Sequence, residues 1–132
     1  MSRILDQAEY DSLPKIAAVD FDGTLAIVKN YRGTGVANRL VMDRVKRLQK
    51  EGWKLILWTC RDDENEDMEL TSAVLFCAKH GLFFDAVNEN IKEVQDLMEG
   101  DTRKIYANVY IDDKSIVDWD KILPLLLEER VV

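Results

Sequence analysis

Two aspartates, Asp20 and Asp22, stand two positions apart directly after the apolar run 15–19. Residues at i and i+2 of an extended segment point to the same side, so both carboxyl groups should face one site. Gly23 then permits a tight backbone turn. Two close carboxylates repel each other, which raises one pKa unless a cation intervenes, so one can attack as an anion while the other carries a proton.

Polar residues also end two later apolar runs. Thr59 follows the run 55–58, and Asp112 and Asp113 follow the run 109–111. In an open parallel α/β sheet, ligands bind outside the carboxyl ends of the strands. We therefore expect these side chains to gather with the first aspartate pair on one rim of a sheet.

The elements that must position these residues alternate along the chain. Apolar runs predict strands at 15–19, 55–58, 83–87 and 109–111, and apolar spacings of three and four predict helices at 36–49, 66–80 and 91–98. Strands that are apolar throughout, separated by helices, indicate a parallel sheet covered on both faces. We expect one α/β domain over residues 1–132, with residues 1–14 as an N-terminal arm.

Composition narrows the chemistry. The 132 residues carry 25 acidic and 18 basic side chains, a net charge of −7, which argues against general nucleic-acid binding. Cys60 and Cys77 have neither metal-site nor redox spacing, and neither begins the C-x5-R pattern of a cysteine phosphatase. His80 is the only histidine, which excludes mechanisms that need two. Carboxylates must carry the chemistry.

The expected location is the cytoplasm. Residues 1–14 lack a cationic start followed by an apolar run, so they do not resemble a signal peptide. No stretch approaches the 18 or more apolar residues of a membrane span. We expect a soluble protein without a membrane partner, and the composition leaves an oligomer open.

Three segments together resemble a known family. Residues 19–25, 57–59 and 111–113 are similar to the first, second and fourth motifs of the haloacid dehalogenase superfamily, in order and in strand placement. One Asp-x-Asp-Gly alone is weak, because calcium loops also contain it. The resemblance covers residues 16 to 116 and implies a three-layer, Rossmann-like α/β/α sandwich with strands in the order 3-2-1-4, which the C-terminal segment could extend.

The resemblance also implies roles for individual residues. Asp20 would be the nucleophile, forming an aspartyl-phosphate, and would also bind Mg²⁺. Asp22 would protonate the leaving oxygen and then activate water, while its backbone carbonyl binds the metal. Thr59 would bind the phosphoryl oxygens, and Asp112 and Asp113 would complete the Mg²⁺ site. Because members that dehalogenate lack the second aspartate, its presence favours phosphoryl transfer.

A cation must also balance the phosphoryl charge. Lys104 is the preferred candidate and Lys92 is its rival. Eight extended residues would place Lys104 about 26 Å from Asp112. Residues 104–107 must therefore fold back, with the last strand beginning near Asn108.

The chain has no room for a large substrate-selecting cap. Residues 26–35 can form a small flap, and residues 88–102 a short excursion near the active rim. The expected substrate is a phosphorylated small molecule or the phosphorylated terminus of a larger one. Residues expected to contact it are Gly23, Thr24, Cys60, Arg61 and Asn88. For Arg61, a surface ion pair with the acidic run 62–67 is the competing expectation.

The sequence therefore predicts a Mg²⁺-dependent phosphomonoesterase that acts through an aspartyl-phosphate on Asp20. The alternative is a non-catalytic phosphate- or metal-binding regulatory module with the same fold. The presence of Asp22 argues against that alternative, because a pure binding site gains little from an acid–base group. A phospho-accepting signalling domain would have its adjacent acidic pair after the first strand, whereas here the adjacent pair follows the last.

Overall fold

A computed structural model describes residues 4–27, 34–115 and 117–123 of the chain. Its helices are α1 (Gln7–Ser12), α2 (Arg39–Lys50), α3 (Glu69–Lys79), α4 (Lys92–Met98) and α5 (Trp119–Ile122). Its strands are β1 (Ile16–Val19), β2 (Ala26–Ile27), β3 (Val36–Ala37), β4 (Lys54–Leu57), β5 (Ala86–Val87) and β6 (Val109–Ile111). Among these described residues, no helix is both long and apolar enough to cross a membrane.

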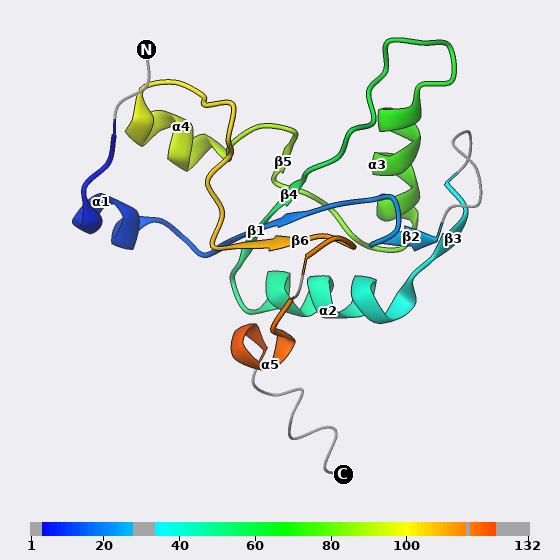
Figure 1. The fold of residues 1–132 in the computed structure, drawn as a ribbon, viewed down its shortest axis with the longest axis horizontal. Helices are drawn as coiled ribbons and strands as arrows, with labels where there is room; N and C mark the ends of the chain where they lie inside the picture. The colour runs from blue at the N-terminus through cyan, green and yellow to red at the C-terminus, as the bar shows by residue number, and fades with distance from the viewer. Residues whose placement is uncertain (1–3, 28–33, 116, 124–132) are drawn as a thin grey trace.

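The main sheet is parallel and has the strand order β5-β4-β1-β6. This is the predicted order 3-2-1-4. Val19 at the end of β1 pairs with Leu57 of β4 and with Ile111 of β6, so three strands end level with one another. The arrowheads of β1 and β6 point to the same side in Figure 1. The residues that follow these strands are therefore delivered to one rim.

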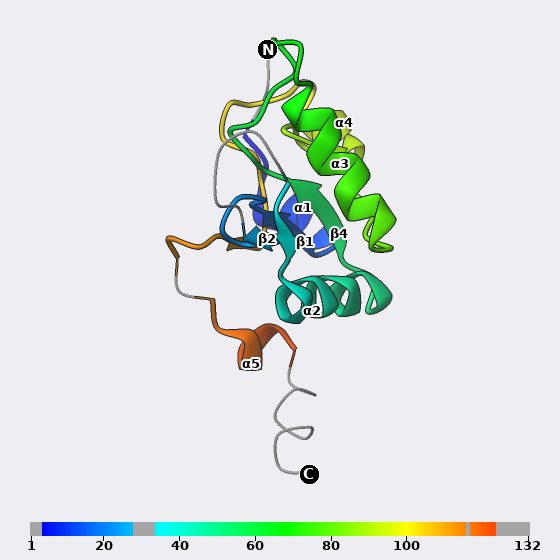
Figure 2. The same ribbon diagram turned by 90° about the vertical axis from the view of Figure 1, so that its right-hand side faces the viewer.

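Helices cover both faces of the sheet, as the uniformly apolar strands predicted (Figures 1 and 2). On one face, Val19 and Leu57 belong to a buried cluster with residues of α2 and α3. On the other face, Ala18 and Ile56 belong to a second cluster with residues of α4. Successive residues of a strand point to opposite faces, so each strand contributes to both cores.

A short antiparallel hairpin interrupts the segment between β1 and α2. Ala26 of β2 pairs with Ala37 of β3. The predicted helix start at residue 36 is therefore wrong, because Asn38 caps α2 by accepting a hydrogen bond from the Val41 amide. The hairpin forms the ends of the predicted flap 26–35, whose residues 28–33 lie outside the described part of the chain.

Each end of the described chain carries a short helix. The segment 1–14, expected to be an arm, contains α1, which begins with a capping box between Asp6 and Glu9. At the other end, the described residues after β6 form α5 rather than a further strand. Residues 124–132, which also belong to the segment that could have extended the sheet, lie outside the described residues.

Candidate active site

Three aspartates meet at the carboxyl ends of β1 and β6. One carboxylate oxygen each from Asp20, Asp112 and Asp113 lies within 4.8 Å of the other two. The level strand ends cause this meeting, and the Asp20 amide continues the ladder by donating to the Ile111 carbonyl at 2.9 Å. Residues more than 90 positions apart in the sequence therefore share one acidic site.

Crowding of negative charge alters the ionisation of Asp20. Burial, followed by repulsion from the Asp112 carboxylate, raises the pKa of Asp20 from 3.8 to about 6. Asp113 and Asp22 add smaller repulsions, while the backbone N–H of Phe21 opposes the shift. The pKa of Asp112 shifts in the opposite direction, because a hydrogen bond from the backbone N–H of Lys114 holds it below the usual value. A cation between these carboxylates would relieve their repulsion.

The donor set fits Mg²⁺. This ion prefers a few carboxylate oxygens, with water and phosphate oxygens in the remaining positions. Asp20, Asp112 and Asp113 supply such a set from one rim of the sheet. The Asp22 carboxylate does not belong to this group, because it faces Arg61 instead. The part predicted for Asp22 in metal binding was its backbone carbonyl, which remains a prediction.

Gly23 allows the acidic residues to approach one another closely. Its φ of +81° is a left-handed conformation that side chains with a Cβ rarely adopt. A Cβ atom at this position would lie 2.6 Å from Oδ2 of Asp113, which is closer than real contacts allow. The turn therefore favours glycine here, and a larger residue would also push the Asp113 carboxylate aside.

Thr24 and Thr59 border the same rim. The buried Thr24 hydroxyl donates to Oδ2 of Asp20 at 3.4 Å. The Thr59 hydroxyl accepts from the backbone N–H of Arg61 at 3.2 Å. The Thr59 amide donates to Oδ1 of Asn88 at 2.8 Å. Asn88 has a φ of +54° and comes directly after β5, so it holds the loop after β4 in place. Its predicted contact with substrate remains a prediction.

Arg61 pairs with Asp22, and its predicted contact with substrate remains a prediction. Its Nε and one terminal nitrogen donate to the two oxygens of Asp22 at 2.9 and 2.8 Å. Only 7% of the residue is exposed, so the expected surface ion pair with the run 62–67 is wrong. Its guanidinium also lies over the Phe21 ring, 4.8 Å from the centroid. The preceding Cys60 is exposed and is not part of a disulfide.

The segment that carries Lys104 is brought back toward the end of β5. Asn90 is fully buried, and its amide group donates to Asp101 at 2.7 Å and to Thr102 at 3.1 Å. Its side-chain oxygen accepts from the Tyr106 amide at 2.6 Å. β6 then begins at Val109, close to the predicted position. Asn90 therefore organises this segment and is too buried to contact substrate.

The two lysines considered for the phosphoryl group are both exposed. Lys92 is the first residue of α4, directly after the excursion from β5. Lys104 lies between Thr102 and the buried Ile105, and its carbonyl accepts from the Thr102 hydroxyl at 2.7 Å. The choice between the two lysines remains a prediction in favour of Lys104.

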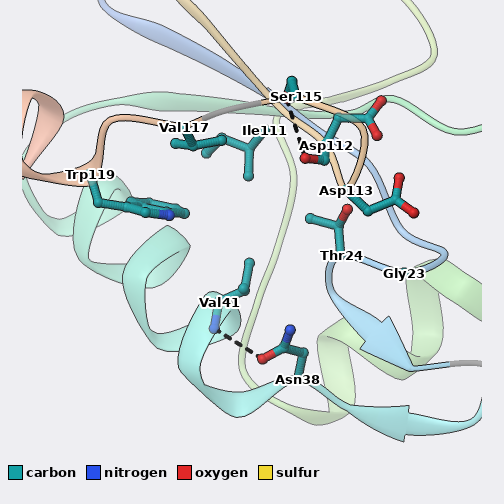
Figure 3. A pocket seen from close by; sticks show the side chains of 10 residues that line it. All are labelled: Gly23, Thr24, Asn38, Val41, Ile111, Asp112, Asp113, Ser115, Val117 and Trp119. Carbon is teal, nitrogen blue, oxygen red and sulfur yellow. Dashed lines mark hydrogen bonds between the residues drawn. The ribbon is translucent and has the colours of Figure 1, made fainter.

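A cavity of about 210 Å³ opens beside the acidic cluster (Figure 3). Gly23, Thr24, Asp112 and Asp113 line one side of it. Val41 of α2, the N-cap residue Asn38 and Trp119 of α5 also line it. A second cavity of about 450 Å³ lies beyond Arg61, along α3. The first volume is below the usual range of about 300–1,000 Å³ for ligand pockets. It suits a small group better than a large molecule.

The sequence was also compared with known proteins. No family model matches it. No curated protein matches it either. A solved structure of an RNA repair complex, Pnkp1/Rnl/Hen1, aligns with 99% of this chain and 35% of its own, at 19% identity and a TM-score of 0.49.

A second solved structure is much more similar. It is a conserved protein from Bacteroides thetaiotaomicron that is 34% identical, with a TM-score of 0.67. The alignment covers 89% of this chain and 93% of the Bacteroides chain. At that identity over nearly the whole of both chains, the chain belongs to the same protein family as this conserved Bacteroides protein.

Proposed function

We propose that this chain is a Mg²⁺-dependent phosphomonoesterase of the haloacid dehalogenase superfamily, with Asp20 as its nucleophile. The observation that carries the proposal is the meeting of Asp20 with Asp112 and Asp113, whose carboxylate oxygens lie within 4.8 Å of one another at the ends of two adjacent parallel strands. The resemblance to the family's motifs pointed to these residues as the site. The acidic cluster that they form is compatible with phosphoester chemistry.

The first half of the reaction forms a phospho-enzyme. A carboxylate oxygen of Asp20 attacks phosphorus, and the bond from phosphorus to the leaving oxygen breaks. Asp22 gives its proton to that oxygen, so the product leaves as an alcohol. The hydroxyl of Thr59 and the backbone N–H after it bind the phosphoryl oxygens, and Lys104 balances their charge.

The second half regenerates the enzyme. A water molecule attacks phosphorus and gives a proton to the carboxylate of Asp22. The bond between phosphorus and the Asp20 oxygen breaks, which releases inorganic phosphate. Mg²⁺ bound by Asp20, Asp112 and Asp113 would supply charge screening for the attack of one anion on another.

The substrate class follows from the open rim. Within the described residues, the acidic cluster lies beside a cavity of about 210 Å³ that is open to solvent. The described ends of the flap form only a short hairpin, in which β2 and β3 have two residues each. A small phosphate ester, or the phosphorylated end of a larger molecule, suits such a site.

The test is a phosphate-release screen with Mg²⁺ over nucleotides, sugar phosphates and phosphorylated nucleic-acid ends. Asp20→Asn should abolish turnover, because an amide does not attack phosphorus, and Asp112→Asn should raise the Mg²⁺ concentration needed for half-maximal rate. Beryllofluoride should bind the wild type and not Asp20→Asn. Equal turnover by Asp20→Asn and wild type would refute the mechanism. Mg²⁺ and phosphate binding without any turnover would favour the non-catalytic module.

A further inference from the structure

Arg61 and Asp22 form an asymmetric ion pair beside the candidate active site. The arginine side chain is 6% exposed, whereas the aspartate side chain is 45% exposed. The guanidinium spans both carboxylate oxygens, with contacts of 2.9 and 2.8 Å. The buried member of the pair is therefore the cation, and the member open to a ligand is the carboxylate.

Contacts other than Asp22 fix the place of the guanidinium. Its remaining terminal nitrogen donates to the Glu69 carbonyl at 3.4 Å, at the start of α3. Its central carbon, Cζ, lies over the Phe21 ring, 4.8 Å from the centroid. Phe21 is fully buried and meets Phe76 of α3 edge-to-face at 5.8 Å. The core thus holds the arginine, and the arginine in turn holds Asp22.

The pairing leaves Asp22 able to react. Each carboxylate oxygen has two acceptor positions, so an oxygen that accepts from Arg61 can still meet a second group. In the described part of the chain, Arg61 is the residue that holds this carboxyl group. Bidentate pairing fixes both the position and the rotation of a carboxylate, which a lysine cannot do.

We propose that Arg61 is a positioning residue that orients Asp22 toward the leaving oxygen of the substrate. The inference rests on the proposed phosphatase function. It differs from the earlier expectation that Arg61 contacts the substrate, because here Arg61 acts through Asp22. Its importance should therefore depend on how strongly the leaving group needs a proton.

The experiment compares Arg61→Lys with wild type on two probes of similar shape, phenyl phosphate and p-nitrophenyl phosphate. Phenolate leaves poorly without a proton, whereas p-nitrophenolate leaves readily. The ratio kcat/KM is measured, because it reports only the steps up to release of the phenol. Arg47→Lys, in the last turn of α2, is the matched control, since it makes the same change away from the rim.

For phenyl phosphate, Arg61→Lys should lower kcat/KM by about 10- to 100-fold, the loss expected when an acid–base group is misplaced by about 1 Å. For p-nitrophenyl phosphate, the loss should be less than about threefold, because little proton transfer is needed. In the Asp22→Asn background, Arg61→Lys should change neither value further. The inhibition constant of inorganic phosphate should stay the same.

Three results would overturn the inference. An equal loss on both probes would give Arg61 a structural or general role. An undiminished loss in the Asp22→Asn background, or weaker inhibition by phosphate, would make Arg61 a direct substrate ligand. If Arg61→Lys does not fold, Phe21→Leu is the second variant, because it loosens the same guanidinium without a change of charge. Equal losses of kcat/KM on both probes in that variant would again refute the proposal. A wild type inactive on every substrate would instead refute the proposed function.

Discussion

Replacing Asp20 with asparagine should stabilise the metal-free protein near neutral pH, although it removes the proposed nucleophile. Burial and the Asp112 carboxylate raise the pKa of Asp20 from 3.8 to about 6 in the folded protein. Ionising Asp20 therefore opposes folding, since a carboxyl group in the unfolded chain ionises at its ordinary pKa. The stability that protonated Asp20 contributes is present below pH 3.8 and is lost as the pH rises to about 6.

The size of the effect follows from that shift. One pKa unit is worth about 1.4 kcal/mol, so the shift of Asp20 corresponds to about 3 kcal/mol at most. Because Asp20 is only partly buried, solvent screening reduces this to about 1–2 kcal/mol. In a domain of this size, that difference raises Tm by roughly 3–10 °C.

The assay is thermal unfolding in EDTA at pH 4 and pH 7.5. At pH 7.5, the Tm of Asp20→Asn should be higher than that of wild type. Most of this difference in Tm should be gone at pH 4, where Asp20 is protonated in the folded state. Asp43→Asn, an exposed change on α2, is the control and should move Tm little at either pH. Added Mg²⁺ should reverse the order, because an ion at 100 times its Kd stabilises the binding form by about 2.7 kcal/mol.

Two results would refute this reasoning. If Asp20→Asn were no more stable than wild type in EDTA at pH 7.5, repulsion among the carboxylates would not strain the folded state. If Mg²⁺ stabilised both proteins equally, Asp20 would not be a metal ligand. The second result would also weaken the proposed function, since the attacking carboxylate should contact the ion.

Four further substitutions test the parts around the nucleophile. Gly23→Ala places a Cβ 2.6 Å from Oδ2 of Asp113, which should weaken Mg²⁺ binding. When Tm is followed against Mg²⁺ concentration, the midpoint should lie at several-fold more metal than for wild type. Lys104→Ala should lower kcat/KM by an amount equal to about 2–4 kcal/mol of transition-state stabilisation. Lys92→Ala should change kcat/KM by less than about threefold, as expected for a solvated charge. If Lys92→Ala had the larger effect, the two lysines would exchange roles. Asn90→Leu removes the hydrogen bonds between this buried side chain and its partly buried partners, and it should lower the free energy of unfolding by about 1–3 kcal/mol in a urea titration. An unchanged value would refute the organising role of Asn90.

Much of the fold could be predicted because its signals are local. Each strand of the parallel sheet is an apolar run that ends in a polar residue, and each large helix has a regular apolar face. The convergence of Asp20 with Asp112 follows from topology, since parallel strands that neighbour each other end at one rim. The start of α2 and the whole of α1 were not predicted correctly, although both had local signals. Asn38 is a good N-cap, and Asp6 with Glu9 forms a capping pattern.

The partners of long polar side chains could not be predicted in the same way. Arg61 precedes a run of acidic residues, and sequence proximity favours pairing with them. In the structure those neighbours are on the solvent side, where ion pairs contribute little. The guanidinium instead turns inward over Phe21 to Asp22, a residue 39 positions earlier.

The same physical reason applies to Asn90. Its three partners lie 11 to 16 positions later in the chain, on a segment without regular structure. A buried amide group must satisfy its hydrogen bonds, but periodicity does not say which backbone will supply them. Strand ends place the carboxylates of this site, whereas buried polar side chains hold Asp22 and the segment 101–106 through partners far away in the sequence. A substitution at Arg61 should therefore separate the orientation of Asp22 from its chemistry more cleanly than a substitution of Asp22 itself.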